Sequence, residues 1–230
     1  MKTADDFLEG QIILIDKPLT WSSFQAVNKL KYILKRKYNL PKKFKIGHAG
    51  TLDPLATGLL IICTGKFTKK ITEIQAQSKE YTGTITVGAT TPSYDLETEI
   101  DKIYPTEHLS EALIFETTKQ FLGEIDQKPP VFSAIKKEGK RLYEHARAGE
   151  EVEIATRKTT IYEFEITRIA LPEIDFRVKC SKGTYIRSLA FDFGLALNSG
   201  AHLSALRRTK IGNYSVENAV LPDDFEKSLE

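Results

Sequence analysis

Two stretches of the chain alternate between apolar and polar residues, which is the pattern of a half-buried β-strand. The first spans residues 81–87, where threonines fill the positions between the apolar ones. The second spans residues 174–180. Shorter apolar runs at 11–15 and 59–63 predict two more strands, and residues 151–171 have a strand-like composition. The alternating residues are Tyr81, Gly83, Ile85 and Val87, then Ile174, Phe176, Val178 and Cys180.

Other stretches repeat their apolar residues at helical spacing. Val27, Leu30 and Leu34 predict a helix that starts at Ser22 or Ser23, because serine caps helix N-termini well, and that runs to about Lys35. The further predicted helices lie near 67–75, after Pro105 with Leu109, Ala112, Leu113 and Phe121 on its apolar side, and at 185–197.

Strands and helices alternate irregularly along the chain, which favours an α+β fold with a mixed, largely antiparallel sheet flanked by helices. We find no internal repeat and no Gly/Ser linker, so we predict one domain over residues 1–230. The longest apolar runs are too short to cross a bilayer, and no secretory signal stands at the start. The two cysteines, Cys63 and Cys180, fit buried thiols in a reducing cytoplasm.

Charge is distributed unevenly, although the net charge is only +2. Residues 29–45 carry eight Lys or Arg and no acid, whereas residues 217–230 carry five acids and one Lys. The basic run fits either a solvated helix face or a surface that binds polyanions. The sequence alone leaves both open.

The string GHAGTLDPLATG at residues 47–58 groups small residues around one imidazole and one carboxylate, those of His48 and Asp53. Small residues allow a backbone and a bulky ligand to approach closely. Asp53-Pro54 also fits a helix N-cap followed by proline at the first helical position. That alternative accounts for Asp53 but not for His48, the glycines and Thr57 together.

This string resembles the catalytic motif of the TruB-type tRNA pseudouridine synthases, which make pseudouridine 55 in the T loop. Further segments resemble the family's other motifs in the same order, so that the resemblance covers roughly residues 10 to 220. It implies the pseudouridine synthase fold. The segments are IDKP at 15–18 with Ser22-Ser23, KEY at 79–81, SAIK at 133–136 with residues 139–147, CSKGTYIR at 180–187, and residues 200–208.

Two departures from the family pattern stand out. The family often has Thr-Asp-Thr-x-Asp after the tyrosine strand, whereas this chain has TPSYD at residues 91–95. Pro92 replaces the first acid and Asp95 keeps the last, so we expect RNA contacts to differ locally. Many relatives continue into a C-terminal PUA domain, and the expectation here is a short form without it.

The resemblance implies three catalytic residues. Asp53 is the essential carboxylate, Tyr81 stacks beneath the target base, and Arg187 lies beside Asp53, where a guanidinium favours the ionised carboxylate. Each has a plainer alternative: a helix N-cap for Asp53, an aromatic core residue for Tyr81 and a surface salt bridge for Arg187. The resemblance further implies a mobile RNA-gripping segment at about 124–152. The implied substrate-binding residues are His48, Lys17, Gly50, Thr51, Lys136, Tyr143, Arg147, Tyr185 and Leu206. His48 could instead be a loop histidine bonded to backbone, and Leu206 a core residue.

The implied reaction rearranges bonds without oxidation or reduction, so we expect no cofactor. We also expect no metal, because His48, His108, His145 and His202 lack ligand spacing. The partner implied is the T stem-loop of tRNA, bound by a cytoplasmic monomer with no membrane and no obligate protein partner. Three rivals stay open: an RNA chaperone without chemistry, a guide-RNA-dependent synthase, and a metal-dependent hydrolase around His48 and Asp53.

Overall fold

A computed structural model describes residues 2–133, 135–137, 139–148, 150 and 152–229. The chain forms two compact units, here called unit 1 (Met1–Tyr81 and Leu206–Glu230) and unit 2 (Thr82–Ala205). Strands β4 (Lys79–Val87) and β12 (Ala201–Ile211) each continue from one unit into the other. The prediction of a single domain stays a prediction.

The sheet of unit 1 is built around β3 (Ala56–Thr64), of which nearly every residue is buried. β3 pairs antiparallel with β1 (Ile12–Lys17) and β2 (Ile46–His48), and parallel with the part of β12 that lies in unit 1. A short β13 (Tyr214–Ser215) pairs with the end of β12. The predicted strands at 11–15 and 59–63 are thereby confirmed and extended.

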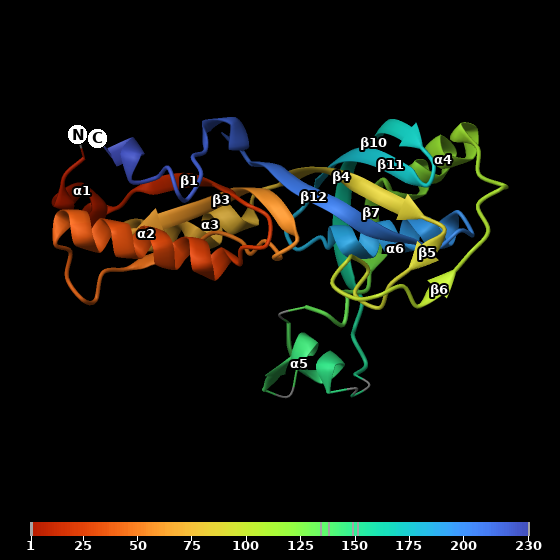
Figure 1. Cartoon of the computed structure of the whole chain (residues 1–230), viewed down its shortest axis with the longest axis horizontal. Helices are drawn as coiled ribbons and strands as arrows, with labels where there is room; N and C mark the ends of the chain where they lie inside the picture. Colours follow the sequence, from red (N-terminus) through yellow and green to blue (C-terminus); the bar gives the residue numbers. More distant parts are fainter. Residues whose placement is uncertain (1, 134, 138, 149, 151, 230) are drawn as a thin grey trace. The chain divides into compact units, whose positions relative to one another are not determined.

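Helices cover both faces of β3, which explains its continuous burial. Leu60 and Ile62 pack with α2 (Ser23–Tyr38), whereas Leu59, Ile61 and Cys63 pack with α3 (Ile71–Ala76). Figure 1 shows α2, in orange, along the strands of unit 1. The other helical segments of this unit are α1 (Ala4–Glu9), η1 (Gly65–Lys70), η3 (Val216–Asn218) and η4 (Lys227–Leu229).

The predicted cap of α2 is confirmed at Ser22. Its side chain accepts from the backbone N–H of Gln25, and the Gln25 side chain accepts from the backbone N–H of Ser22, which forms a capping box. Val27, Leu30 and Leu34 are buried as predicted. The helix runs three residues past the predicted end at Lys35, to Tyr38.

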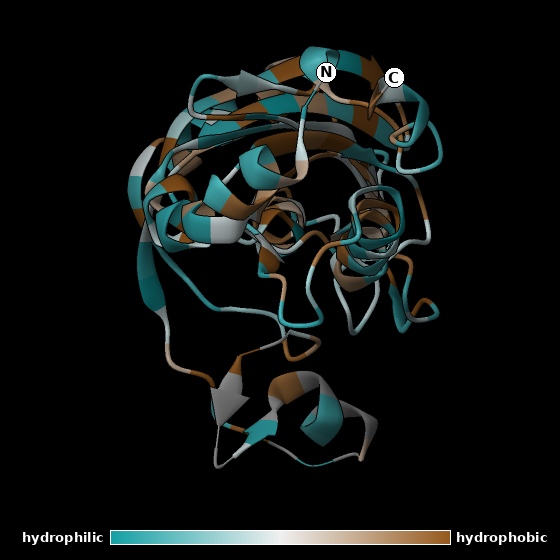
Figure 2. Cartoon of the chain, turned by 90° about the vertical axis from the view of Figure 1, so that its left-hand side faces the viewer, coloured by the Kyte–Doolittle hydropathy of each residue, from teal (hydrophilic) through white to brown (hydrophobic). Residues whose placement is uncertain are grey.

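The sheet of unit 2 has the strand order β12-β4-β11-β10-β7. β10 (Arg157–Ala170) pairs antiparallel with both β7 (Gly123–Gln127) and β11 (Glu173–Cys180). The alternation in residues 81–87 and 174–180 matches the observed burial, which confirms both predicted strands. Figure 2 shows hydrophilic and hydrophobic segments alternating along the ribbons.

Helix α6 (Ile186–Ala196) packs in unit 2 beside α4 (Glu111–Thr118). The ring of Phe193 on α6 meets Phe164 of β10, with ring centroids 5.4 Å apart. The remaining short elements are η2 (Lys119–Phe121), β5 (Ala89–Thr90), β6 (Lys102–Ile103), β8 (Lys136–Lys137), β9 (Lys140–Arg141) and α5 (Leu142–Arg147).

One local prediction is wrong, and one alternative is excluded. The helix after Pro105 buries Ile114, Thr117 and Thr118, while Ala112 and Leu113 are exposed. Its first residue is Glu111, because the Ser110 side chain caps it by accepting from the N–H of Leu113, and Leu109 lies before the helix. The excluded alternative is a helix N-cap at Asp53, because Asp53 and Pro54 do not start a helix. They form a turn, in which the Asp53 carbonyl accepts from the Ala56 N–H at 3.1 Å.

The α+β class with a mixed, largely antiparallel sheet flanked by helices is confirmed. Cys63 and Cys180 are both buried, as predicted. In the part of the chain that the structure describes, no helix is both long enough and apolar enough to span a membrane.

Candidate active site

The string at 47–58 folds as the end of β2, a loop and the start of β3. We call residues 49–55 the catalytic loop. Its first residue, Ala49, is buried and donates its N–H to the Ile61 carbonyl at 2.8 Å. Leu52 is buried and Asp53 is only partly buried. The loop is therefore anchored at its apolar residues, while Asp53 stays partly exposed.

Arg208 of β12 is buried, with only 2% of the residue exposed, and it contacts the catalytic loop. Its guanidinium donates to the carbonyls of Gly50 at 3.0 Å, Thr51 at 3.3 Å and Leu59 at 2.8 Å. A planar fork of donors suits three fixed acceptors better than a single ammonium does. Sequence reasoning assigned no role to this arginine, although it stands in the last family motif.

Gly58 allows β3 to come close to the backbone of Arg208. Its φ of +99° favours glycine, and a Cβ there would lie 2.3 Å from the Arg208 carbonyl oxygen. The parallel pairing of Gly58 with Arg208 therefore requires a glycine.

Lys17, at the end of β1, is fully buried. Its ammonium donates to the carbonyls of Trp21 at 2.6 Å, Pro18 at 2.9 Å and Pro54 at 3.5 Å. Burial lowers the pKa of Lys17 to about 8, against a raising effect of the Asp53 charge and a further lowering by Arg208. Lys17 thus ties the turn at Pro54 to the chain that follows β1.

His48 ends β2 and is partly buried. Burial lowers its pKa, the charge of Arg208 lowers it further, and the Gly50 backbone opposes the shift. A neutral imidazole therefore prevails at neutral pH. Among the described residues, no hydrogen-bond partner meets the buried Nδ1 atom.

The start of α2 is bonded to the catalytic loop as well. The Ser23 hydroxyl donates to the Leu52 carbonyl at 3.1 Å and accepts from the Leu52 N–H at 2.9 Å. Just before the helix, Thr20 donates its N–H to the Pro54 carbonyl at 2.8 Å. The loop that carries Asp53 is consequently fixed by β12, by the end of β1 and by α2.

Tyr81 of β4 and Leu206 of β12, both in unit 1, are also predicted site residues. Tyr81 is buried and Leu206 partly buried, and Leu206 pairs with Ala56 next to the catalytic loop. The Thr57 hydroxyl donates to the Leu206 carbonyl at 3.4 Å.

Arg187 lies in the first turn of α6 and is only 4% exposed, so the surface salt-bridge alternative is wrong. Its guanidinium donates to the carbonyls of Phe132 at 2.9 Å and Ser93 at 3.3 Å. The carboxylate of buried Asp95 lies 3.6 Å away. The stretch that carries Pro92 thus folds into a support for Arg187.

Tyr185 caps α6 and is held through both backbone groups by one side chain. The buried amide of Gln127 accepts from the Tyr185 N–H at 2.7 Å and donates to its carbonyl at 3.0 Å. Arg157 lies over the Tyr185 ring, 4.4 Å from its centroid.

Two family models together match residues 35–230. The model "TruB family pseudouridylate synthase (N terminal domain)" matches residues 35–186, and the model "tRNA pseudouridylate synthase B C-terminal domain" matches residues 187–230. This chain belongs to the TruB family. The predicted family and the predicted class of reaction, pseudouridine synthesis, are confirmed.

Curated relatives of this TruB-family chain match it over nearly its full length. A tRNA pseudouridine synthase B of Flavobacterium johnsoniae is 77% identical, over 99% of this chain and 100% of the relative. A protein of the same name from Parabacteroides distasonis is 56% identical, over 98% of this chain and 95% of the relative.

Solved structures support the fold of the TruB-family chain. A chain in a Cbf5-Nop10-Gar1 complex is 29% identical with a TM-score of 0.73, and covers 100% of this chain. A chain in an H/ACA RNP bound to a substrate RNA containing 2'-deoxyuridine is also 29% identical, with a TM-score of 0.69 over 96% of this chain. The TruB-family chain spans 58% and 53% of the lengths of these two solved chains.

The predicted site residues of the TruB-family chain fall into both units. Unit 1 contains Asp53 and Tyr81, and unit 2 contains Arg187, so the predicted pairing of Asp53 with Arg187 stays a prediction. Of the remaining predicted residues, unit 1 contains Lys17, His48, Gly50, Thr51 and Leu206, and unit 2 contains Tyr185. The predictions for Lys136, Tyr143 and Arg147 fall on side chains outside the described ones, although their backbones lie in β8 and α5.

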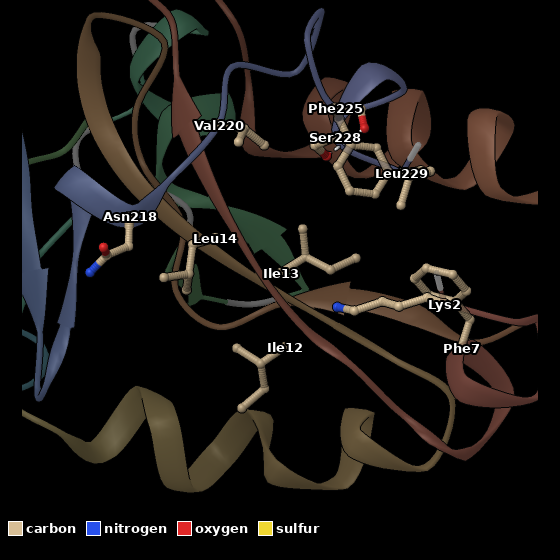
Figure 3. Close-up of a pocket in the computed structure, with 10 residues that line it drawn as sticks. All are labelled: Lys2, Phe7, Ile12, Ile13, Leu14, Asn218, Val220, Phe225, Ser228 and Leu229. Atoms are coloured by element: carbon tan, nitrogen blue, oxygen red, sulfur yellow. Dashed lines mark hydrogen bonds between the residues drawn. The ribbon is translucent and has the colours of Figure 1, made fainter.

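A groove in unit 1 has a volume of about 530 Å³ and lies apart from these residues, because none of them lines it. Figure 3 shows its walls, which come from Lys2 and Phe7, from β1 and from the C-terminal residues.

Proposed function

We propose that this chain is a tRNA pseudouridine synthase, which isomerises uridine 55 in the T loop with Asp53 as the catalytic carboxylate. The observation that carries the proposal is 77% identity over 99% of the chain to a tRNA pseudouridine synthase B. The catalytic loop supports it independently, because three separate elements hold it around the partly exposed Asp53.

The reaction breaks the bond between N1 and C1′ and joins C5 to C1′. The base turns in between, the hydrogen on C5 leaves as a proton, and N1 gains a proton. No redox partner is needed, because the product is an isomer of the substrate and the formal changes at C5 and C1′ cancel. Asp53 acts as nucleophile or as base in this scheme.

A uridine inside a folded RNA loop must be unstacked before it reaches Asp53. Flipping costs a few kcal/mol and is offset by stacking in the pocket and by phosphate contacts. We assign the stacking to Tyr81 and the ionised state of Asp53 to Arg187. His48, Gly50, Thr51, Lys17, Leu206 and Tyr185 complete the proposed pocket.

The proposed partner is the T stem-loop of tRNA, read by its shape and its splayed bases. Lys136, Tyr143 and Arg147 belong to the segment that grips it, and the chain works as a cytoplasmic monomer without a protein partner, cofactor or metal. A reaction rate that is unchanged in excess chelator supports the proposal that no metal is needed.

Pseudouridine mapping in a tRNA transcript after incubation tests the proposal. Asp53→Asn should abolish tritium release from C5-labelled uridine and leave filter binding of the tRNA nearly unchanged, because many cations share the affinity. Retained turnover in Asp53→Asn would remove Asp53 from the mechanism. Binding without turnover in the wild type would favour the chaperone alternative.

A further inference from the structure

The solvent side of α2 carries a stripe of side chains that the proposed mechanism does not use. We call Phe24, Asn28, Lys31, Tyr32 and Lys35 the α2 stripe. Their spacing of three and four residues keeps them on one side of the helix. The opposite side, with Val27, Leu30 and Leu34, is buried against the sheet of unit 1 (Figure 1).

Both aromatic residues of the α2 stripe are unusually exposed. Phe24 is 68% exposed and Tyr32 is 66% exposed, and among the described large hydrophobic residues only Ile103 exceeds them. Single exposed apolar residues are ordinary. Two aromatic rings among lysines are the combination with which proteins bind single RNA strands, by stacking and by phosphate contacts.

The charge of the stripe is not neutralised by the chain itself. In the C-terminal tail, Asp223 pairs with Lys29, and Glu226 pairs with Arg36, whose guanidinium lies over the Tyr32 ring, 5.7 Å from its centroid. Across the residues that the structure describes, Lys31 and Lys35 make no ion pair. Since residues 29–45 contain no acid, the stripe attracts polyanions.

The stripe starts where the catalytic loop is fixed. Ser23, whose hydroxyl makes both hydrogen bonds to Leu52, directly precedes Phe24. From Phe24 to Lys35 the helix advances about 16 Å. An RNA strand that runs from Asp53 along α2 meets Phe24 first and the two lysines after it.

We propose that the α2 stripe is a second RNA-binding surface, which takes up the phosphodiester backbone of the substrate tRNA adjoining the modified loop. Lys31 and Lys35 contact phosphates, and Phe24 stacks on a base or packs on a ribose. The inference rests on the proposed function, since it names the same tRNA as the ligand.

Filter binding of a whole tRNA transcript over a series of salt concentrations tests the proposal with Lys31→Glu/Lys35→Glu. We expect the Kd to rise about tenfold or more, and the logarithmic salt slope to lose roughly 0.7 to 0.9 for each lost phosphate contact. The matched control is Lys102→Glu/Lys119→Glu, which changes the net charge equally in unit 2 and should bind like the wild type.

Phe24→Ala tests the stacking contact without a change of charge. It should weaken tRNA binding severalfold with an unchanged salt slope, whereas Ile103→Ala, at the other highly exposed apolar residue, should have no effect. The proposal is overturned if Lys31→Glu/Lys35→Glu binds within twofold of the wild type, or no more weakly than its matched control. If the wild type makes pseudouridine in the same tRNA, that result removes the stripe alone and leaves the proposed function standing.

Discussion

Two buried cations, Lys17 and Arg208, donate hydrogen bonds to backbone carbonyls of the segment that carries Asp53. A buried charge is costly unless hydrogen bonds satisfy it, so each of these residues must find its carbonyl acceptors. Their acceptors are backbone atoms, and the two cations therefore specify the path of the loop rather than the identity of its side chains. Both residues are positioned to act on Asp53 through that backbone.

Arg208→Lys keeps the positive charge but removes the planar guanidinium, which donates to three carbonyls. We expect kcat to fall about a hundredfold with little change in KM, because a small displacement of a catalytic group has effects of that order. The control is Arg207→Lys, at the neighbouring arginine, whose partly exposed pair with Asp16 contributes at most about 1 kcal/mol. Steady-state kinetics measures kcat and KM of both variants, and thermal unfolding measures their stability. If the two lose activity equally, Arg208 serves only the stability of β12.

Lys17 makes the stability of the fold depend on pH. Because burial lowers its pKa from 10.5 to about 8, the unfolded chain binds more protons at this residue between those two values. The free energy of unfolding therefore rises with pH through that window. The wild type should gain in Tm relative to Lys17→Met as the pH rises from about 8 to 10.5. A constant difference between the two proteins would show that Lys17 is not shifted.

At the scale of the elements, the sequence predicted those strands and helices whose periodicity is set by one buried face. α2, α6 and the strands at 81–87 and 174–180 are of this kind. β12 was not predicted as a strand, because its inward side includes the charged Arg208 and its outward side is not uniformly polar. The face of α4 was misjudged because the cap at Ser110 sets which residues turn inward.

The candidate site was predicted through the family resemblance, since no periodicity points to Asp53. The sequence did not predict the buried residues that hold the candidate site in place. No role was predicted for Asp95 beyond keeping the last acid of the family pattern, yet it is buried beside Arg187. Arg208 contacts residues more than 150 positions earlier in the chain, and such a contact leaves no local pattern in the sequence.

Gly58 tests how closely β3 and β12 must approach. Gly58→Ala adds both a strained φ and a collision with the Arg208 backbone, so we expect a loss of more than about 3 kcal/mol in the free energy of unfolding. Gly123 has a similar φ of +88° but no atom within 4 Å of the added Cβ. Gly123→Ala should therefore cost only the backbone strain, about 1 kcal/mol. Denaturant unfolding of both variants separates the two contributions, and equal losses would refute the collision.

At the scale of the whole molecule, opposite charges within one chain meet in unit 1. The sequence indicates a basic run and an acidic tail, and predicts no contact between them. Instead Asp223 and Glu226 pair with α2, while Phe225 and Leu229 fix the tail in the core. The tail therefore neutralises part of the positive charge on α2 in the same unit.

Asp223→Asn/Glu226→Gln releases Lys29 and Arg36 from these pairs. Exposed ion pairs contribute little, so the change in unfolding free energy should stay below about 1 kcal/mol for each pair. Affinity for tRNA at low salt should increase, because two more cations become available to phosphates. Filter binding at two salt concentrations measures the effect. A weaker affinity would show that the tail acids help to bind the RNA.

The discontinuity of unit 1 has a consequence for synthesis on the ribosome. Unit 2 is one uninterrupted stretch, whereas unit 1 combines the first part of the polypeptide with its last. The loop around Asp53 is synthesised early. Its hydrogen bonds to Arg208 form only later, because Arg208 is translated 158 residues after Gly50. A nascent chain released before that point has the carboxylate that we propose to be catalytic but not the guanidinium that holds its loop. We therefore expect an incomplete product that ends before Arg208 to have little activity.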